Sequence, residues 1–129
     1  MIILSSAVRI FLCTRPTDMR KSFDGLTGLV QECFGQHPLT GHLFLFLNRR
    51  KDRIKILYFD RDGLALWYKR LEAGTFEIPG TAQGDGIELQ PAQLAMILSG
   101  IDLKSARQRK RFRHVGGIAK TGENPRRST

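Results

Sequence analysis

Hydrophobic residues in the first third of the chain alternate briefly and then adopt a helical spacing. The alternation over residues 8–13 predicts a β-strand. Apolar residues then recur three or four positions apart, at Met19, Phe23, Leu26, Val30 and Cys33. This spacing places them on one face of a helix. With Asp18 as the N-cap and Gly35 at the end, the pattern predicts one long helix over about residues 19–36.

The middle of the chain predicts three strands joined by short turns. Both faces are apolar over residues 42–47, as expected of a strand at the centre of a sheet. Residues 53–71 predict a hairpin, because two β-favouring, aromatic-rich runs flank a turn sequence at residues 60–63. Three consecutive strands with short connections predict an antiparallel meander, and residues 74–78 are a candidate fourth strand.

The last third of the chain predicts a loop, a short extended piece and a second helix. Residues 79–86 are glycine-rich and predict the loop, and the extended piece covers residues 87–89. Pro91 is favourable at a first helical position, and Gly100 ends the apolar pattern that follows it. We therefore expect a short C-terminal helix.

These elements combine into an α+β fold. We expect an antiparallel β meander centred on residues 42–71, with the long helix packed on it and the short helix at the C-terminal end. After Leu103 the hydrophobic periodicity fails and charged residues take over. The sequence therefore predicts a single domain over residues 1–103 and a basic tail over residues 104–129, whose composition is typical of disorder.

The net charge is distributed unevenly along the chain. The 129 residues carry a formal charge of +9. Nine basic residues and one acidic residue give the tail +8, whereas twelve basic and eleven acidic residues give residues 1–103 only +1. A strongly basic protein binds polyanions, with nucleic acid the first candidate and an acidic membrane surface the second. An anion site on the domain therefore needs local clustering.

Basic residues gather in short segments that are candidate phosphate contacts. In the domain these are Arg20, Lys21, Arg49, Arg50, Lys51, Arg53, Lys55, Lys69 and Arg70. In the tail they are Arg107, Arg109, Lys110, Arg111 and Arg113. A helix start with two cations can hold a phosphate, and a basic loop can straddle a phosphate backbone. The plainer explanations are solvated charges at the helix start, protection of sheet edges by the loop, and a solubilising tail.

Few residues suggest catalysis or metal binding. Asp18, Asp60 and Asp62 have simpler roles as cap and turn residues than as the converging carboxylates of a nuclease. The cysteines and histidines lack zinc-site spacing, and no nucleotide loop or catalytic triad is present. We expect no enzyme activity, no cofactor and no metal. Cys13 and Cys33 are expected to be reduced thiols of a cytoplasmic protein, since no secretory signal or membrane-spanning run is found.

Four ordered segments resemble a known family. They are DMRKSFDGL at residues 18–26, PLTGHLF at 38–44, KILYFDRDG at 55–63 and WYKRLEAGTF at 67–76. Together they are similar to the small accessory protein, often labelled TnpB, of bacterial insertion sequences that also encode a separate DDE-type transposase. The resemblance covers about residues 4–103. Phe59 replaces a usual Trp, and residues 76–79 replace a stretch that is often more basic.

The resemblance implies a non-catalytic role in transposition, with the chemistry left to the transposase. From the charge pattern we expect binding to DNA through the basic surface and tail, together with contact to the transposase of the same element. The alternative is a protein-interaction module that binds the transposase without contacting DNA, with Trp67 and Tyr68 as anchors. A metal-dependent nuclease is the third hypothesis.

Overall fold

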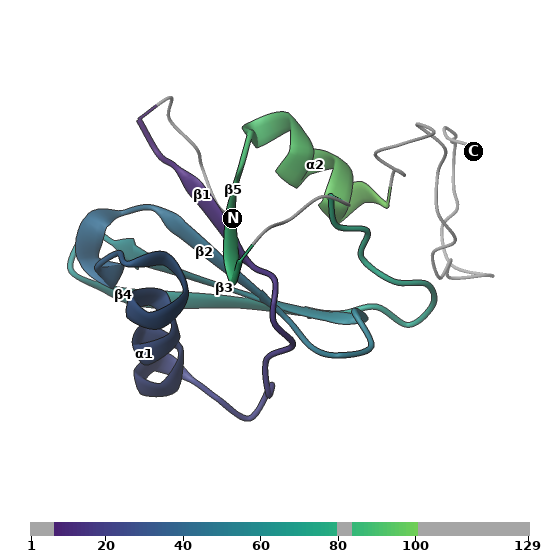
Figure 1. Ribbon diagram of the computed structural model, residues 1–129, viewed down its shortest axis with the longest axis horizontal. Coiled ribbons are helices and arrows are strands. Elements are labelled where there is room, and N and C mark those ends of the chain that lie inside the picture. Colours follow the sequence, from purple (N-terminus) through teal and green to yellow (C-terminus); the bar gives the residue numbers. More distant parts are fainter. Residues whose placement is uncertain (1–6, 80–83, 101–129) are drawn as a thin grey trace.

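The computed structural model describes residues 7–79 and 84–100 of the chain. Its elements are β1 (Ile10–Cys13), α1 (Phe23–Phe34), the 3-10 turn η1 (Pro38–Thr40), β2 (Leu43–Leu47), β3 (Arg53–Asp60), β4 (Gly63–Arg70), β5 (Gly86–Leu89) and α2 (Pro91–Ser99). The strands form one sheet in the order β4-β3-β2-β1-β5 (Figure 1). β1 and β2 are parallel, and the other neighbouring pairs are antiparallel.

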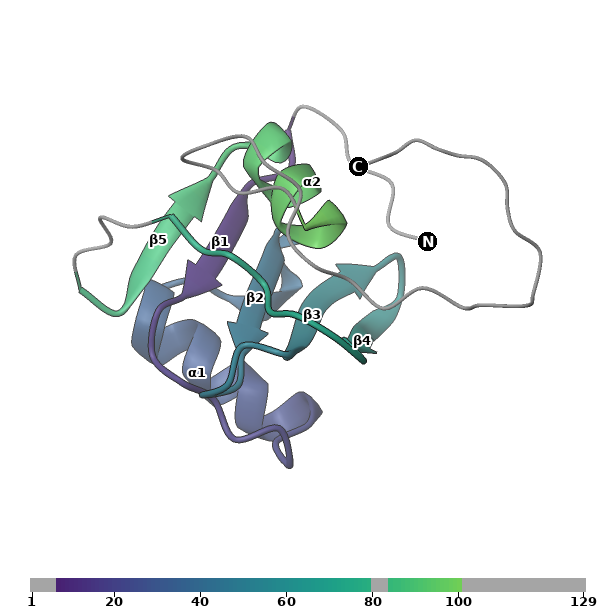
Figure 2. The ribbon, with the colours of Figure 1, turned by 90° about the vertical axis from the view of Figure 1, so that its right-hand side faces the viewer.

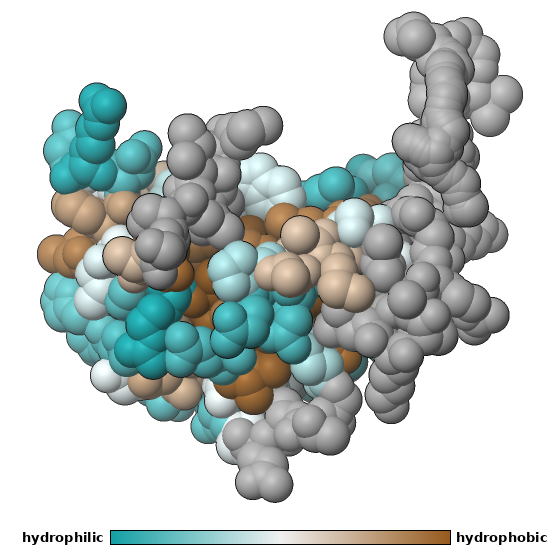
Figure 3. Space-filling view, turned by 90° about the horizontal axis from the view of Figure 1, so that it is seen from above, coloured by the Kyte–Doolittle hydropathy of each residue, from teal (hydrophilic) through white to brown (hydrophobic). Residues whose placement is uncertain are grey.

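The sheet lies between two covering layers. α1 packs on one face and α2 on the other (Figure 2). On the α1 side, Leu26 and Val30 of the helix are fully buried against phenylalanines of β1 and β2. On the α2 side, Leu94 and Ile97 cover a core of leucines and isoleucines. Seen from that side, apolar residues appear between hydrophilic ones beside α2 (Figure 3).

β2 is the central strand, as its two-sided apolar sequence predicts. All five of its residues are buried, and it occupies the third of five positions in the sheet. Phe44 and Phe46 face α1, whereas Leu43, Leu45 and Leu47 face α2. A strand buried on both faces has apolar residues at every position instead of an alternation with polar ones. The sequence therefore indicated the central position, which the structure confirms.

The predicted fold class is wrong in its topology. The sheet is mixed rather than an antiparallel meander, because β1 pairs in parallel with β2 and β5 adds beyond β1. Only β2, β3 and β4 follow one another as antiparallel neighbours. A parallel pair needs a long crossover connection, and α1 with η1 supplies it between β1 and β2. The short apolar run of β1 does not itself specify which strand it joins.

The predicted extent of the long helix is also wrong. α1 has 12 residues and begins at Phe23 rather than near residue 19. Asp18 does not cap it: the Asp18 Oδ1 atom accepts from the backbone N–H of Arg20 at 2.9 Å, and a turn over residues 18–21 precedes the helix. Its end is confirmed, since Gly35 adopts a left-handed φ of 61°.

α2 matches the predicted C-terminal helix closely. It runs over Pro91–Ser99, with the proline in its first turn and Gly100 in a left-handed conformation at its end. The capping box between Gln90 and Gln93 adds a start signal. The predicted division at Leu103, and the tail over residues 104–129, lie outside the described residues.

The segment between β4 and β5 is not the candidate fourth strand. Residues 71–79 contain no helix or strand, and Leu71 and Phe76 bury their side chains in the core of the α2 side. The backbone N–H of Phe76 donates to the carbonyl of Lys51 at 2.7 Å. The segment therefore covers the sheet face and is fixed to the connection between β2 and β3.

Candidate nucleic-acid interface

The strand directions bring two of the predicted basic segments to one end of the sheet. The connection at residues 48–52 joins the end of β2 to the start of β3, and β4 ends beside that start. In the register, Arg53 lies opposite Arg70 and Ile54 opposite Lys69. The cations of the connection therefore lie next to those at the end of β4.

Asn48 fixes the shape of this connection. Its side-chain Oδ1 accepts from the backbone N–H groups of Asp52 at 3.1 Å and Arg53 at 3.0 Å. Its Nδ2 donates to the Asp52 carboxylate at 2.6 Å, and this hydrogen bond is the main reason that the pKa of Asp52 lies below its ordinary value. A loop closed on itself in this way holds its side chains in place before any ligand arrives.

Lys51 takes an unusual backbone conformation within the connection. Its φ is 59°, in the left-handed region that most residues other than Gly, Asn and Asp avoid. The carbonyl of Lys51 accepts from Phe76, and that of Asp52 accepts from the N–H of Leu71 at 2.7 Å. The covering segment thus braces the loop, which presents Arg49 and Arg50 to solvent beside Lys51.

The turn at residues 18–21 joins the same end of the sheet. The backbone N–H of Thr17 donates to the carbonyl of Leu47, the last residue of β2, at 2.8 Å. Both the turn and the β2–β3 connection lie toward the lower edge of Figure 2. The turn that carries Arg20 and Lys21 therefore lies at the same end of the sheet as residues 49–53, although about 30 positions separate them in sequence.

Lys55 holds the turn against the sheet and is not part of the exposed surface. Its side chain is 6% exposed, and Nζ donates to the carbonyls of Met19 at 2.8 Å and Lys21 at 2.7 Å. Nζ also lies 4.7 Å from the ring centroid of Tyr68. These contacts satisfy an ammonium group with three donors. The prediction of Lys55 as a phosphate contact is therefore replaced by a structural role.

We call the resulting surface the basic end. It comprises Arg20, Lys21, Arg49, Arg50, Lys51, Arg53, Lys69 and Arg70. Among the described residues, ion pairs connect Arg20 to Asp18 at 2.7 Å, Arg70 to Glu72 at 2.9 Å and Arg50 to Asp52 at 4.0 Å. Three of these eight cations therefore have a carboxylate partner in these ion pairs. Every cation except Arg53, which is half-buried, is exposed.

The carboxylates Asp18, Asp52 and Glu72 form ion pairs with arginines of the basic end. The pKa of Asp18 is lowered from 3.8 to about 2, chiefly because the guanidinium of Arg20 donates to both carboxylate oxygens. The same pair raises the pKa of Arg20. Both side chains are exposed, so the pair contributes little to stability. Its main effect is to reduce the positive charge of the surface.

Arg53 and Arg70 form an unfavourable pair within this surface. They are directly opposed on β3 and β4, and both belong to the face that packs on α1. Like charges directly opposite each other destabilise a sheet. Glu72 relieves part of this repulsion through Arg70.

Other predicted groups are placed differently. Trp67 is half-buried in the core of the α2 side, whereas Tyr68 is 47% exposed on the α1 side. Cys13 and Cys33 are free thiols. Within residues 7–79 and 84–100, no three side chains of the metal-binding types gather as a site, and no helix has the length and apolarity to cross a bilayer. The five tail cations lie outside the described residues.

Comparisons with known proteins identify the family of this chain. Residues 8–108 match the family described as IS66 Orf2 like protein. The chain is 40% identical over 109 residues to "Uncharacterized protein y4hO" of Sinorhizobium fredii (strain NBRC 101917 / NGR234), which covers 84% of this chain and 94% of that protein. It is 33% identical over 98 residues to "Uncharacterized protein y4jC" of the same strain, over 76% and 83% of the two chains. No solved structure matches.

The family match spans most of this chain, and the alignments with the two relatives span most of the length of those proteins. The comparisons define an accessory protein associated with a bacterial insertion sequence and its transposition. The chain belongs to the IS66 Orf2-like family. The resemblance to the TnpB-type accessory proteins is thereby confirmed.

Proposed function

We propose that this accessory protein binds DNA non-specifically through the basic end, without catalysing strand cleavage or joining itself. One observation carries the proposal: three segments that are separate in sequence bring eight cations to one end of the sheet, and the ion pairs join three of them to carboxylates. A phosphate backbone is the polyanion that such a row of exposed arginines and lysines binds.

The plainer explanation of edge protection does not account for this arrangement. β4 is an edge strand, but its residues 63–68 are uncharged and only Lys69 and Arg70 at its end are basic. Arg49, Arg50 and Lys51 lie in a connection rather than along an edge. Charges that protect an edge are expected along its length. Clustering at one end instead supports contact with an extended anion.

The described carboxylates support a role without catalysis. Asp18 is bound by Arg20, and Asp52 by Asn48 and Arg50. Phosphodiester chemistry of the metal-dependent type needs carboxylates that converge on a divalent ion. We expect supercoiled plasmid to remain intact when incubated with the protein and Mg²⁺ or Mn²⁺. If an activity that nicks or linearises the plasmid copurifies with the protein, this part of the proposal is wrong.

The decisive experiment compares three full-length variants by fluorescence anisotropy on a labelled duplex. The first removes the loop charges through Arg49→Gln, Arg50→Gln and Lys51→Asn, since Asn accepts the left-handed conformation at residue 51. The second is Arg61→Asn, a control at the opposite end of the sheet with a similar φ of 60°. The third replaces the five tail cations by Gln, at Arg107, Arg109, Lys110, Arg111 and Arg113.

Salt dependence separates the contributions. Each phosphate contact changes the slope of log K against log salt by about 0.9, so the loop variant should show a slope shallower by about 2.7. Arg61→Asn should match the wild type. If the loop variant retains the wild-type slope while the tail variant loses it, the domain does not contact DNA. If the wild type does not bind duplex at about 50 mM salt, the DNA proposal fails.

Docking to the transposase is the second candidate, and Tyr68 favours it. Tyr68 is 47% exposed although its ring is large and apolar enough for an interface anchor. Trp67, the other predicted anchor, is half-buried. Under this candidate, Tyr68→Ala weakens binding to the purified transposase of the same element at least tenfold, and it weakens duplex binding much less, through the lost ring contact of Lys55. If the wild type and Tyr68→Ala bind the transposase with equal affinity, Tyr68 is not the anchor.

A further inference from the structure

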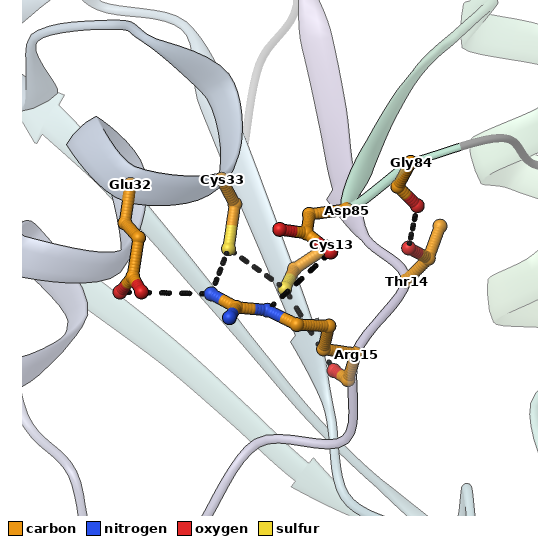
Figure 4. A network of polar contacts seen from close by, with 7 residues as sticks. All are labelled: Cys13, Thr14, Arg15, Glu32, Cys33, Gly84 and Asp85. Atoms are coloured by element: carbon orange, nitrogen blue, oxygen red, sulfur yellow. Dashed lines mark hydrogen bonds and ion pairs between the residues drawn. The ribbon is translucent and has the colours of Figure 1, made fainter.

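Two cysteines that the proposed function does not use meet between β1 and α1. Cys13 is the last residue of β1 and Cys33 lies in the last turn of α1, with their Sγ atoms 3.3 Å apart (Figure 4). A disulfide bond needs about 2.05 Å between sulfurs, so the two Sγ atoms must approach each other by roughly 1.2 Å. We propose that Cys13 and Cys33 are a modification site, at which a peroxide converts the two thiols into a reversible intramolecular disulfide.

Arg15 makes the two thiols chemically unlike. Its Nη2 donates to the Sγ atom of Cys33 at 2.9 Å, and Figure 4 shows the guanidinium reaching toward α1. The Sγ atom of Cys13 instead donates to the carbonyl of Arg15 at 3.7 Å. The guanidinium stabilises the negative charge that the Cys33 sulfur carries as it attacks peroxide. Cys33 is also the more exposed of the two thiols, so it reacts first.

Burial assigns Cys13 the second step. The Cys13 side chain is 2% exposed, and burial is the main reason that its pKa is raised to about 11, with the neighbouring Cys33 adding to the effect. Cys13 therefore remains a thiol while Cys33 reacts. It is already within 3.3 Å of the sulfur that it must attack, which compensates for its low fraction of thiolate.

Two carboxylates position the guanidinium. Glu32 Oε1 lies 3.6 Å from Arg15 Nη2, and Asp85 Oδ1 lies 3.8 Å from Arg15 Nε. They hold Arg15 between α1 and the start of β5, and they also offset part of its charge. A pocket of about 200 Å³ beside the pair is lined by residues that include Cys13, Arg15 and Glu32 but not Cys33. Cys33 is partly exposed, so hydrogen peroxide can reach it without entering this pocket.

The proposed reaction balances with hydrogen peroxide as the oxidant. The Cys33 thiolate attacks one peroxide oxygen, the O–O bond breaks, and hydroxide leaves and takes up a proton as water. This step leaves a sulfenic acid on Cys33. Cys13 then loses its proton and attacks the Cys33 sulfur, the S–O bond breaks, and a second water leaves. Overall, two thiols lose two electrons and two protons, and one peroxide is reduced to two waters.

The first test oxidises the full-length protein with hydrogen peroxide under conditions that preserve the fold. We expect the intact mass to fall by about 2 Da and both thiols to be lost, with full recovery after dithiothreitol. Trypsin should then release a disulfide-linked pair that spans residues 10–20 and 22–49, because Pro16 protects the bond after Arg15. The cross-link should raise the melting temperature by about 10 °C, since it closes a loop of about 20 residues.

Single-cysteine variants test the order of the two steps. Cys13→Ser should accumulate a sulfenic acid on Cys33 that dimedone traps, and Cys33→Ser should be labelled at least tenfold more slowly. Arg15→Gln should slow the loss of thiols, whereas Glu32→Gln should accelerate it by freeing the guanidinium. A purely structural role of these two residues does not predict opposite effects on the rate.

Several results would overturn the proposal. Wild-type protein that retains both thiols under peroxide excludes the site, as does a product that is linked between two chains. Equal labelling of the two single-cysteine variants excludes Cys33 as the first thiol. The outcome is independent of the DNA proposal, because no DNA is present and Cys13 and Cys33 lie outside the basic end.

Discussion

At one end of the β3–β4 ribbon Arg53 lies opposite Arg70, and at the other end Asp60 lies opposite Gly63. Each of the two connections of β3 holds one cation in a left-handed conformation, with φ of 59° at Lys51 and 60° at Arg61. Arg61 lies between two aspartates, whereas Lys51 follows two arginines. Similar backbone geometry is therefore compatible with opposite charge, so the fold does not require the positive charge of the basic end.

The same contrast extends over the described part of the chain. Arg9 and Arg61 are its only basic residues at the end away from the basic end, and Arg9 is bound by Glu88 through hydrogen bonds of 2.7 and 2.9 Å. The net charge of +1 over residues 1–103 thus conceals a separation of charge. An extended anion responds to the local excess and not to the sum.

The largest expected effect comes from the residue that brings the turn at residues 18–21 to the basic end. Lys55→Met removes the donor of the Met19 and Lys21 carbonyls and keeps most of the aliphatic stem. We expect a loss of about 2 kcal/mol in the free energy of unfolding by urea, because two carbonyls lose their partner. Affinity for DNA should also fall, since the turn loses its attachment to the sheet.

Lys69→Met provides the matched control for that substitution. Lys69 is exposed on the neighbouring strand, so its replacement should change the free energy of unfolding by less than about 0.5 kcal/mol. If Lys55→Met is as stable as Lys69→Met, the buried ammonium does not hold the turn.

The burial of Lys55 is a feature that the sequence did not predict. The alternation of β3 places Lys55 on the same face as Leu57, which is fully buried, so a signal for burial was present. Charge was the stronger cue, because lysine is almost never fully buried unless it is paired. Its partners are backbone carbonyls about 35 positions away, and no periodicity along the chain indicates them.

The fold divides in the same way into local and distant information. The central position of β2, the β3–β4 hairpin and both ends of α2 follow from residues within each element, and they are confirmed. The parallel pairing of β1 with β2 depends on contacts between strands about 30 residues apart. Asp18 had the right chemistry for a cap, but the guanidinium two residues later competes for its carboxylate. Convergence of the basic segments could not be predicted without that topology.

Thr17 is expected to show a smaller effect, and one of opposite sign. Its Oγ1 is buried and has no hydrogen-bond partner among the described residues. Thr17→Val preserves the shape and removes a hydroxyl whose burial is unfavourable, so we expect a gain of about 1 kcal/mol and a melting temperature about 4–8 °C higher. Thr14→Val is the control, because Thr14 Oγ1 donates to the carbonyl of Gly84 at 2.7 Å and its loss should destabilise.

The two left-handed cations allow the comparison to be tested with single substitutions. Lys51→Asn and Arg61→Asn should each change stability by no more than about 0.5 kcal/mol, in the stabilising direction, because Asn tolerates positive φ. Only Lys51→Asn should reduce the salt slope of DNA binding, by about 0.9. Equal salt slopes for the two variants would show that the two ends of the β3–β4 ribbon do not differ in their contact with DNA.

The smallest expected effect concerns the carboxylate that offsets Arg20. Asp18→Asn keeps an acceptor for the Arg20 backbone N–H and removes one negative charge from the basic end, so duplex affinity should rise about twofold at low salt. Asp62→Asn, at the opposite end, should leave affinity unchanged. Equal effects of the two substitutions would indicate a response to net charge alone.

The same carboxylate gives a dependence on pH with a definite sign. The pKa of Asp18 is about 2 in the folded protein, below its ordinary value of 3.8. Its contribution to stability is therefore present above about pH 4 and is lost as the pH falls toward 2. Melting curves of the wild type should shift to lower temperature more steeply over that range than those of Asp18→Asn. The difference should be small, because both side chains are exposed. Parallel curves would mean that the pair with Arg20 makes no measurable contribution to stability.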